Sequence, residues 1–411
     1  MILKAPIAIG LSPNTENDDV WQAIKIIFQP WMWQEGDAIK KVLEWFKNYF
    51  NFDEAFLFNS GRSALYVVLK SFGIDKGDEV LVQAFTCVAV PDPVIWTGAK
   101  PIFVDIDETL NIDPGLLEKH INRKTKVIIV QHTFGIPAQI ELIKKIAQKY
   151  NLILIEDCAH SLGAEVYGKK VGTFGDAVIF SFGRDKVISS VFGGMASINS
   201  KFKTQCLQLK KLQGNLNFPG YFWILQQLLH PIFFVIILPL YNLIVGKLFL
   251  AILIKLRILT KPIFKEEMNG FKPDVFPAKY PNALAVLLLN QLTKLQHYNN
   301  IRIKLASYYF DKLKETKNII LPVQVDGGIY LRFNIQLPNS EEILLTAKKQ
   351  GILLGNWYKN IVDPKYVDYK KIGYYLDSCP KAELSAKSSV NLPTYPKLSI
   401  SDLEKIVKLL T

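Results

Sequence analysis

Residues 152–186 read LILIEDCAHSLGAEVYGKKVGTFGDAVIFSFGRDK, and this stretch decides the fold. Its first apolar run ends in Glu156-Asp157, and a second apolar run, AVIFSF, precedes Lys186. Short apolar runs rich in β-branched and aromatic residues predict buried parallel strands. Ligands of open α/β sheets bind outside the carboxyl ends of the strands. The stretch therefore predicts an α/β fold that delivers a carboxylate and an amine to one cleft.

Strands and helices alternate around this stretch, from Glu54 to about Asn199. This alternation predicts a largely parallel sheet with crossover helices. The segment 283–312 has helical periodicity without Gly or Pro, which predicts one long linking helix. Beyond it we expect a strand in GGIYLRFNIQL, a helix in SEEILLTAKKQG and a final helix that begins at about Ser399.

The chain has 411 residues, which is more than one compact domain usually contains, so we predict two domains with separate cores. The expected order is an N-terminal segment (1–50), a large domain (51–214), an apolar helical insertion (215–265), a linking region with the long helix (266–312) and a small C-terminal α+β domain (313–411).

The predicted insertion is unusually apolar. Between Lys211 and Lys247 the chain has no Asp, Glu, Lys or Arg. A membrane-spanning helix needs about 20 apolar residues, and residues 221–259 nearly suffice for two. Pro231 and Pro239 are expected to interrupt the helices, which favours an interfacial or re-entrant hairpin over two spans. Basic flanks place both ends on the cytoplasmic side, whereas the alternative is burial in an oligomer interface or a large core.

The composition and net charge of the chain disfavour several classes of protein. The four cysteines and five histidines form no disulfide or zinc pattern, which fits a reducing cytoplasm. The N-terminus lacks the long apolar run of a secretory signal. A net charge of +12 suits an anionic lipid or a phosphorylated substrate. Nucleic acid is disfavoured, because the basic residues are scattered and no nucleic-acid-binding motif is present.

Lys186 and Asp157 together suggest pyridoxal phosphate. A buried lysine can form an imine with a carbonyl cofactor and then serve as a general base. A carboxylate at Asp157 would keep the pyridine nitrogen of the cofactor protonated. Taken singly, Lys186 is an ordinary surface lysine and Asp157 an ordinary helix N-cap. The apolar strand before Lys186 and the pair Gly193-Gly194 after it favour the catalytic interpretation.

Three further features fit the same cofactor. The run Ser60-Gly61-Arg62-Ser63 lies between a strand and a helix, where free amides and the helix dipole attract a phosphate. Ser181, on the strand before the lysine, is a second candidate phosphate donor, unless its hydroxyl is paired within the strand. His160 is expected beside the ring, and a half-buried structural histidine is the equal alternative.

These motifs resemble the DegT/DnrJ/EryC1/StrS family of sugar aminotransferases. The resemblance runs from FNSGRSAL through GDEVLVQAFTCVAV, EDCAHSLGA, GKKVGTFGD and FSF with its lysine to LPTYPKLSISDLEKIV. It implies a fold type I architecture, and it implies Lys186 as the imine lysine, Asp157 as the partner of the pyridine nitrogen and His160 beside the ring. It also implies phosphate contacts from Ser181 and the 61–63 turn, and a homodimer with active sites at the subunit interface.

The chain departs from the family pattern at several positions. Cys87 stands where members of the family usually have an aromatic residue that stacks on the cofactor ring. We therefore expect Cys87 beside the ring, and we expect His160 or Phe85 to stack on it instead. Phe192 replaces an acidic residue, and Pro277 and Lys279 replace the Asn and Arg that reach into the partner's site. The apolar insertion is not a usual family element. These departures indicate a divergent branch with an altered substrate pocket.

The expected activity is transfer of an amino group from glutamate to a nucleotide-linked keto-sugar for surface polysaccharide synthesis, with a lipid-linked sugar as a variant. The expected location is the cytoplasm, at the inner face of the cytoplasmic membrane. One alternative is a sugar dehydratase on the same fold, against which the presence of Lys186 argues. Another is a membrane-associated scaffold that binds the cofactor without turnover.

Overall fold

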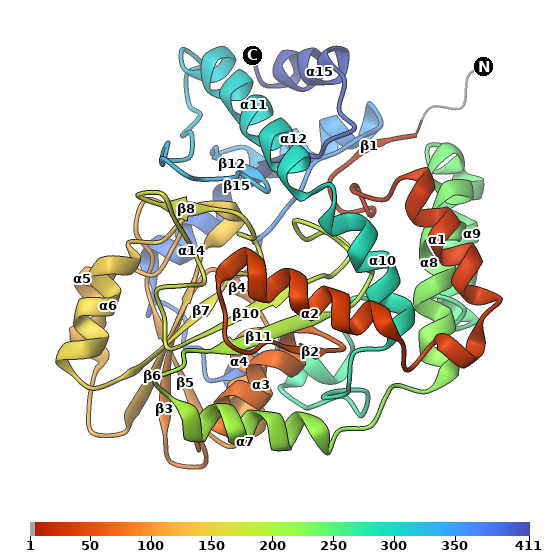
Figure 1. Cartoon of the computed structure of the whole chain (residues 1–411). Coiled ribbons are helices and arrows are strands. Elements are labelled where there is room, and N and C mark those ends of the chain that lie inside the picture. The colour runs from red at the N-terminus through yellow and green to blue at the C-terminus, as the bar shows by residue number, and fades with distance from the viewer. Residues whose placement is uncertain (1–4) are drawn as a thin grey trace.

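The computed structural model describes residues 5–411, and a seven-stranded sheet lies at its centre (Figure 1). The strand order is β2-β11-β10-β7-β6-β3-β5. β11 runs antiparallel to both neighbours, and the other neighbouring strands are parallel. The α/β prediction is confirmed. The strands are β2 (Phe56–Phe58), β3 (Glu79–Gln83), β5 (Lys100–Val104), β6 (Thr125–Gln131), β7 (Ile153–Asp157), β10 (Ala177–Ser181) and β11 (Gly194–Ile198).

Helices cover both faces of the sheet because both faces of its strands are apolar. In β6, Val127 and Ile129 join the core on one face, and Ile128 and Val130 join the core on the other. The first face packs on α3 (Gly61–Ser71), α4 (Pro91–Thr97) and α7 (Lys203–Gly214). The second packs on α2 (Asp37–Phe50), α5 (Pro114–His120), α6 (Ile140–Lys149) and α10 (Asn282–Leu292). The sheet is therefore the middle of three layers, as parallel sheets require.

A second core forms around the C-terminal elements, which lie together at the top of Figure 1. It contains the antiparallel pair β12 (Phe333–Gln336) and β15 (Ser389–Leu392), with α11 (Leu295–Leu313), α12 (Ser340–Lys349) and α15 (Ile400–Leu410). α14 (Pro380–Ser388) and the short α13 (Tyr369–Ile372) pack nearer the sheet. The predicted start of the last helix is confirmed, because the side chain of Ser399 caps it.

Short strand pairs join segments that are far apart in the sequence. β1 (Ile7–Ala8) pairs with β13 (Ile352–Leu353), and β4 (Thr86–Cys87) pairs with β14 (Val362–Asp363). β8 (Glu165–Val166) and β9 (Lys169–Lys170) form a small hairpin. Three 3-10 turns complete the elements, η1 (Pro30–Met32), η2 (Thr133–Gly135) and η3 (Glu266–Asn269).

Two predictions about local structure were wrong. The linking helix is not continuous, because α10 ends at Leu292 and α11 begins at Leu295. The two halves then pack in different cores, α10 against the sheet and α11 in the C-terminal core. The strand expected in GGIYLRFNIQL is reduced to β12, since its first residues turn into the large domain, where the Ile329 amide donates to the Gly135 carbonyl.

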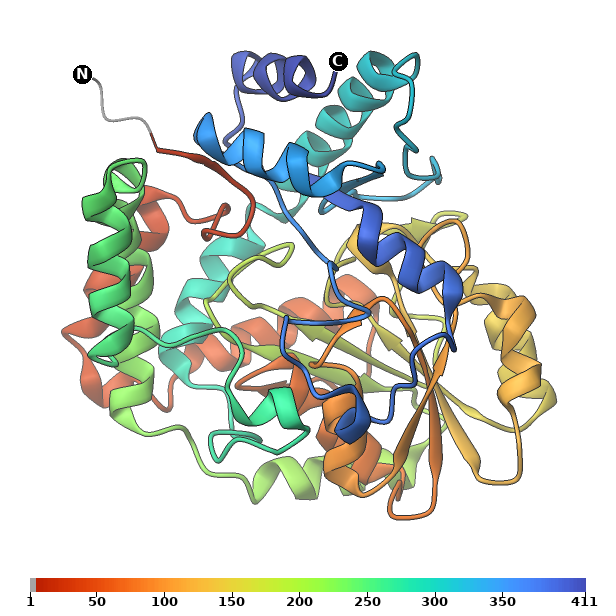
Figure 2. The ribbon, with the colours of Figure 1, turned by 180° about the vertical axis from the view of Figure 1, so that it is seen from behind.

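The apolar insertion forms a helical hairpin of α8 (Tyr221–Leu240) and α9 (Ile244–Lys255). α1 (Asn17–Ile27) lies beside α8 at the edge of the molecule in both Figure 1 and Figure 2. The predicted interruption by proline was wrong, since α8 continues through Pro231 and Pro239. Packing of its buried side chains against α1 and α10 outweighs the two missing amide donors.

α8 is the one helix of residues 5–411 with the length and apolar composition to cross a membrane, and half of its most apolar stretch is buried in the protein. α9 has 12 residues, fewer than the roughly 20 that a span needs. Length and composition alone are therefore weak evidence for a span.

Candidate active site

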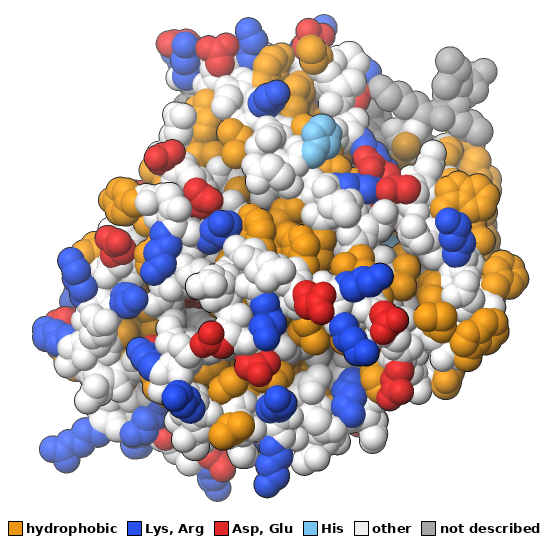
Figure 3. All heavy atoms as spheres, viewed as in Figure 1, with side chains coloured by type: hydrophobic (Ala, Val, Ile, Leu, Met, Phe, Trp, Pro, Cys, Tyr) orange, Lys and Arg blue, Asp and Glu red, His pale blue; other side chains and the backbone are white. Residues whose placement is uncertain are grey.

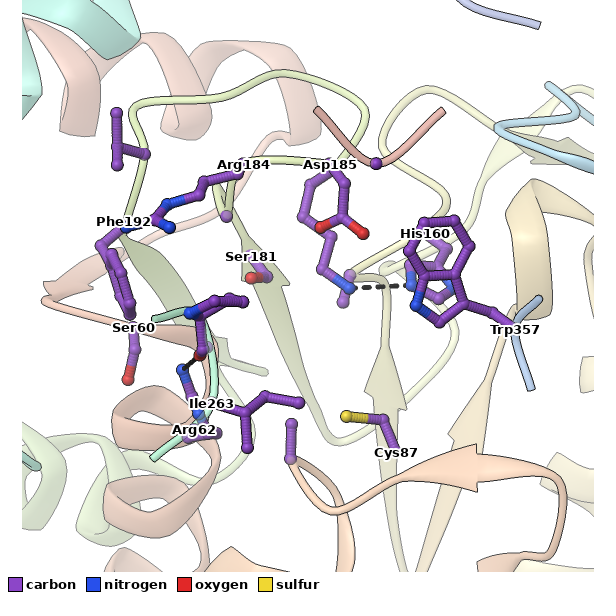
Figure 4. A pocket seen from close by; sticks show the side chains of 18 of the residues that line it. Ser60, Arg62, Cys87, His160, Ser181, Arg184, Asp185, Phe192, Ile263 and Trp357 are labelled. Carbon is purple, nitrogen blue, oxygen red and sulfur yellow. Dashed lines mark hydrogen bonds between the residues drawn. The ribbon is translucent and has the colours of Figure 1, made fainter. Parts of the chain in front are cut away.

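A cavity of about 360 Å³ lies at the carboxyl ends of β7 and β10 (Figure 4). Asp157 ends β7, Ser181 ends β10, and Lys186 follows in the next loop. Asp157 is in register with Ile179, so the two strands end side by side. The structure thus brings the amine and the carboxylate to one cavity. Of the predicted site residues, those that line it are Gly61, Arg62, Cys87, Asp157, His160, Ser181 and Lys186.

The adjacent carboxylates Glu156 and Asp157 have different surroundings because neighbouring strand residues face opposite sides. Glu156 is fully buried and accepts hydrogen bonds from the amides of Gly172, Phe174 and Gly175, each at 2.7 Å. Asp157 faces the cavity and accepts one amide, from Ala159, at 3.0 Å. Glu156 therefore holds the 172–175 loop, and Asp157 is free to meet a ligand.

Lys186 is held beside His160, with 2.8 Å between the lysine Nζ and the histidine Nε2. The other ring nitrogen, Nδ1, accepts the amide of Phe134 at 3.4 Å. A neutral histidine that accepts at Nδ1 carries its proton on Nε2, which then donates to Lys186. Both contacts are satisfied together only when Lys186 is a neutral amine.

Burial shifts the pKa values of Lys186 and His160 in directions that suit this arrangement. It lowers the pKa of Lys186, although the nearby Asp185 carboxylate opposes the shift. Burial, with Lys186 and Arg332, also holds the pKa of His160 well below its usual range. Burial raises the pKa of Asp157, against the Ala159 amide and the charge of Lys186. A depressed lysine pKa favours the nucleophilic form of the amine.

The turn before α3 forms an anion cradle with Ser181. The Ser60 side chain caps the helix by accepting the Ser63 amide, and the amides of Gly61 and Arg62 precede the first helical hydrogen bonds. A Cβ added to Gly61 would lie 3.0 Å from Cβ of Ser181, so glycine lets the turn approach the strand. Among the described residues the Ser181 hydroxyl has no hydrogen-bond partner. The cavity lining therefore contains two amides without helical partners and, close to them, a hydroxyl.

Gly194 has a related role. A Cβ at this position would lie 2.4 Å from the Ser60 carbonyl oxygen, so only glycine lets β11 approach the turn. The pair Gly193-Gly194 thus supports the cradle.

Two predicted phosphate contacts have other partners in the structure. The Arg62 guanidinium lines the cavity but is paired with buried Glu267, and its second nitrogen donates to the Pro262 carbonyl at 2.9 Å. The Ser63 side chain is fully buried outside the cavity lining and donates to Asn59 Oδ1 at 2.7 Å. At position 62 the backbone amide, rather than the side chain, is directed to the cradle.

The aromatic wall differs from the expected set. Phe85 is buried against Phe134 and Tyr358 and does not line the cavity. His160 does line it, and its ring is stacked on Phe134 with 5.8 Å between centroids. Cys87 faces His160 across the cavity (Figure 4), and burial raises the pKa of its thiol to about 12. Of the two expected stacking residues, His160 alone is in position.

Sequence reasoning missed Arg332, Asp185 and Trp357. Arg332 is 2% exposed, pairs with Asp185 and lies 3.7 Å above the centre of the Trp357 ring. Burial would raise the pKa of Asp185, but Arg332 and Lys186 outweigh it and hold that pKa low. Asp185 adjoins Lys186 in the sequence, which was a usable signal, whereas Arg332 and Trp357 are brought in from the C-terminal region.

Two distant residues hold the backbone of the lysine loop. The Asn14 side chain donates to the carbonyls of Lys186 at 2.7 Å and Val187 at 3.1 Å. Arg302 of α11 donates to the Val187 carbonyl at 2.7 Å and to Asn14 Oδ1 at 3.1 Å. The position of Lys186 therefore depends on both the N-terminal segment and α11.

The apolar insertion is also part of this site. Phe234 of α8, Leu250 and Ile254 of α9 and the segment 259–263 line the cavity. Thr260 accepts both ends of the Arg184 guanidinium, at 2.8 Å on its carbonyl and 2.7 Å on its hydroxyl. Thr260 in turn donates to Gln227 of α8 at 3.0 Å. The insertion thus fixes a cation inside the cavity.

The model of the DegT/DnrJ/EryC1/StrS aminotransferase family matches residues 14–218 and 263–411. The chain belongs to this family. The match covers the sheet, the lysine loop and the C-terminal core, and it leaves out the helical hairpin. The prediction of an aminotransferase is therefore confirmed at family level.

Relatives of this family cover the chain to different extents. It is 27% identical to the "Pleiotropic regulatory protein" of Geobacillus stearothermophilus over 91% of this chain and 88% of that one. It is 39% identical to the GDP-perosamine synthase of Escherichia coli O157:H7, over 44% of this chain and half of the relative. The solved structure of the putative sugar aminotransferase Spr1654 from Streptococcus pneumoniae, in its PMP form, has a TM-score of 0.75 and 20% identity, with 99% and 96% of the chains covered. This likeness confirms the aminotransferase fold.

Proposed function

We propose that the chain is a pyridoxal-phosphate-dependent aminotransferase that moves an amino group from glutamate to a keto-sugar in glycan synthesis. The observation that carries the proposal is the meeting of Lys186, Asp157 and the anion cradle in one cavity. Family membership and the sugar named in GDP-perosamine synthase support it.

The residues present fit this cofactor. The cradle of the Gly61 and Arg62 amides and Ser181 would hold its phosphate, Asp157 its pyridine nitrogen and His160 one face of its ring. Bound there, pyridoxal phosphate supplies an electron sink for a carbanion of the substrate. Cys87 would lie near the opposite face, where its neutral thiol offers less contact than an aromatic ring.

The protein's own contribution is proton control in a buried site. Lys186 Nζ, as a neutral amine, would accept the proton that leaves Cα of the amino donor, and in the separate half-reaction with the keto-sugar it would deliver a proton to the carbon that becomes aminated. Asp157 remains next to the pyridine nitrogen and favours its protonated form. His160 stays neutral and positions Nζ through Nε2.

The test is the reaction with glutamate alone. The holoprotein should lose the visible absorbance of its bound cofactor when L-glutamate is added without an acceptor, as the cofactor passes to its amine form. Lys186→Ala should lack the absorbance of the lysine-linked cofactor and should not convert. An unchanged spectrum of the wild type with glutamate would favour a scaffold without turnover. Conversion by Lys186→Ala at the wild-type rate would refute the role of Lys186.

We also propose that the protein lies at the inner face of the cytoplasmic membrane. Trp21, Phe28, Trp31, Phe222, Ile244 and Val245 are 60–82% exposed, and we call this set the outer apolar face. The ring of Trp33, next to η1, lies 5.8 Å from that of Tyr221 at the start of α8, so the two parts adjoin. Figure 3 shows apolar side chains gathered at the edge formed by α1, α8 and α9. So large an exposed apolar patch is typical of a membrane or protein contact.

A homodimer is the expected assembly, because the family resemblance implies active sites at a subunit interface.

The basic residues that flank the hairpin support the proposed membrane contact, because they suit an anionic lipid surface. Among them are Lys255, Arg257 and Lys261.

A further inference from the structure

The inner side of the hairpin gives the cavity an apolar wall. Phe234, Leu250, Ile254 and Leu259 line the cavity, and all lie in the stretch that the family model leaves unmatched. The lysine, the aspartate and the cradle line the same cavity from the sheet. The cavity is therefore polar at the sheet and apolar at the hairpin.

Two cationic side chains, Arg184 and Lys261, also line the cavity. Arg184 is half-buried in the cavity lining, and its two contacts with Thr260 are both uncharged. Its Nε is buried and has no hydrogen-bond partner within residues 5–411. Lys261 has no ion pair with the described residues. A guanidinium without a bonded carboxylate is suited to phosphate oxygens.

The order of these parts matches one kind of substrate. A sugar at Lys186, a phosphate or diphosphate at Arg184 and Lys261, and an alkyl chain along the hairpin would each meet complementary groups. A nucleoside would place hydrogen-bonding base edges against Phe234, Leu250 and Ile254. Buried polar groups without partners cost free energy, so this wall disfavours a base.

We propose that the keto-sugar acceptor is carried on a phosphorylated isoprenoid or similar lipid chain, and that α8 and α9 bind the chain. This rests on the proposed aminotransferase function and replaces the nucleotide with a lipid as the carrier of the sugar. Phe222, Ile244 and Val245 of the outer apolar face belong to the same hairpin, so a lipid chain would pass from the bilayer surface to the cavity along α8 and α9.

The first experiment measures binding of soluble probes to the wild-type holoprotein by calorimetry, below their micelle concentrations. Affinity should rise from isopentenyl to geranyl to farnesyl diphosphate, by about tenfold or more over the series. Farnesol should bind more weakly than farnesyl diphosphate because it lacks the charges. UDP should bind more weakly than farnesyl diphosphate. A flat series, or tighter binding of UDP, would overturn the proposal.

The second experiment uses two leucines of α9. Leu250 lines the cavity, whereas Leu248 is 59% exposed and outside the lining. Leu250→Gln should weaken farnesyl diphosphate binding about tenfold, and Leu248→Gln should leave it within twofold. Equal effects of the two substitutions would contradict the lipid site.

The glutamate reaction separates this proposal from the general function. Leu248→Gln should still convert the cofactor with glutamate, and both leucine variants should keep the visible absorbance of the bound cofactor, which shows that they are folded. If the wild type fails to convert, the aminotransferase function falls whatever the isoprenoid probes do. If it converts and the probes show no dependence on chain length, the lipid carrier alone is refuted.

Discussion

Glu156 and Asp157 are neighbours in β7 with separable roles, which a matched pair of substitutions can test. Asp157→Asn should slow glutamate conversion by about 10²–10³-fold, because the ring nitrogen loses its charged partner. It should keep the visible absorbance and change stability little. Glu156→Gln should lower the free energy of unfolding by about 3 kcal/mol, because three amides lose a charged acceptor.

Spectroscopy with glutamate and urea denaturation measure the two effects. If Glu156→Gln slowed conversion as much as Asp157→Asn did, without loss of stability, the division of roles would be wrong.

Asp92 of α4 predicts a pH dependence of stability. It is fully buried, its two oxygens have no hydrogen-bond partner in the described part of the chain, and burial next to Glu267 raises its pKa to about 9. The folded protein therefore binds a proton that the unfolded chain releases above its pKa near 4. Stability from this group is complete below that value and falls as the pH rises toward 9.

Asp92→Asn keeps the shape and removes the titration. Its advantage in unfolding free energy over the wild type should grow by about 1–3 kcal/mol between pH 5 and pH 8. Urea denaturation at the two pH values measures it. An advantage that shrinks as the pH rises would contradict the buried, protonated carboxyl.

The residues of the cavity that could be predicted are those within short sequence motifs. Asp157, His160, Ser181 and Lys186 follow directly from two strand ends, where the geometry is local. Arg332 could not be found in this way, because its place is set by packing of the C-terminal core on the sheet. The partner of Arg62 was missed for a similar reason, since Glu267 lies beyond the insertion.

At the scale of elements, we predict that the hairpin of α8 and α9 binds membranes. This can be tested without deleting the hairpin. Deletion of the hairpin would also remove the cavity wall, so substitutions on its outer apolar face are the better test. Ile244→Ser with Val245→Ser should weaken cosedimentation with anionic lipid vesicles several-fold, because two side chains 60–82% exposed lose their insertion into lipid. Leu384→Ser, an equally exposed site on α14, is the control.

Vesicle binding that is equal for the double variant, the control and the wild type would refute attachment through this face. High salt should weaken binding of the wild type as well, because the basic flanks contribute.

The elements of the sheet could be predicted because apolar strand runs and helical periodicity are local signals. The hairpin was harder to predict, since proline is a strong local breaker and only tertiary packing explains the continuity of α8. The break between α10 and α11 could not be predicted either, because no Gly or Pro lies there. The two helices separate because they pack in different cores.

At the scale of the whole molecule, the outer apolar face is a candidate for the proposed membrane contact and for the proposed dimer contact, and the mass in solution distinguishes the two. Sedimentation should give twice the chain mass of 46.7 kDa in solution. The Ile244→Ser, Val245→Ser variant should keep that mass, because the outer apolar face is reserved for lipid. Dissociation of this variant to monomers would show instead that α9 packs in the oligomer interface.

The loop of Lys186 is held by residues that come both earlier and later in the sequence. Asn14 and Arg302 donate hydrogen bonds to its backbone. Arg332 pairs with Asp185, which adjoins Lys186. On the ribosome, the lysine emerges well before α11 and β12 have been synthesised. A nascent chain that ends near residue 200 has the strands of the cavity floor but lacks the groups that hold the lysine loop. Cofactor loading therefore follows completion of the C-terminal region, and truncated chains stay in the apo form.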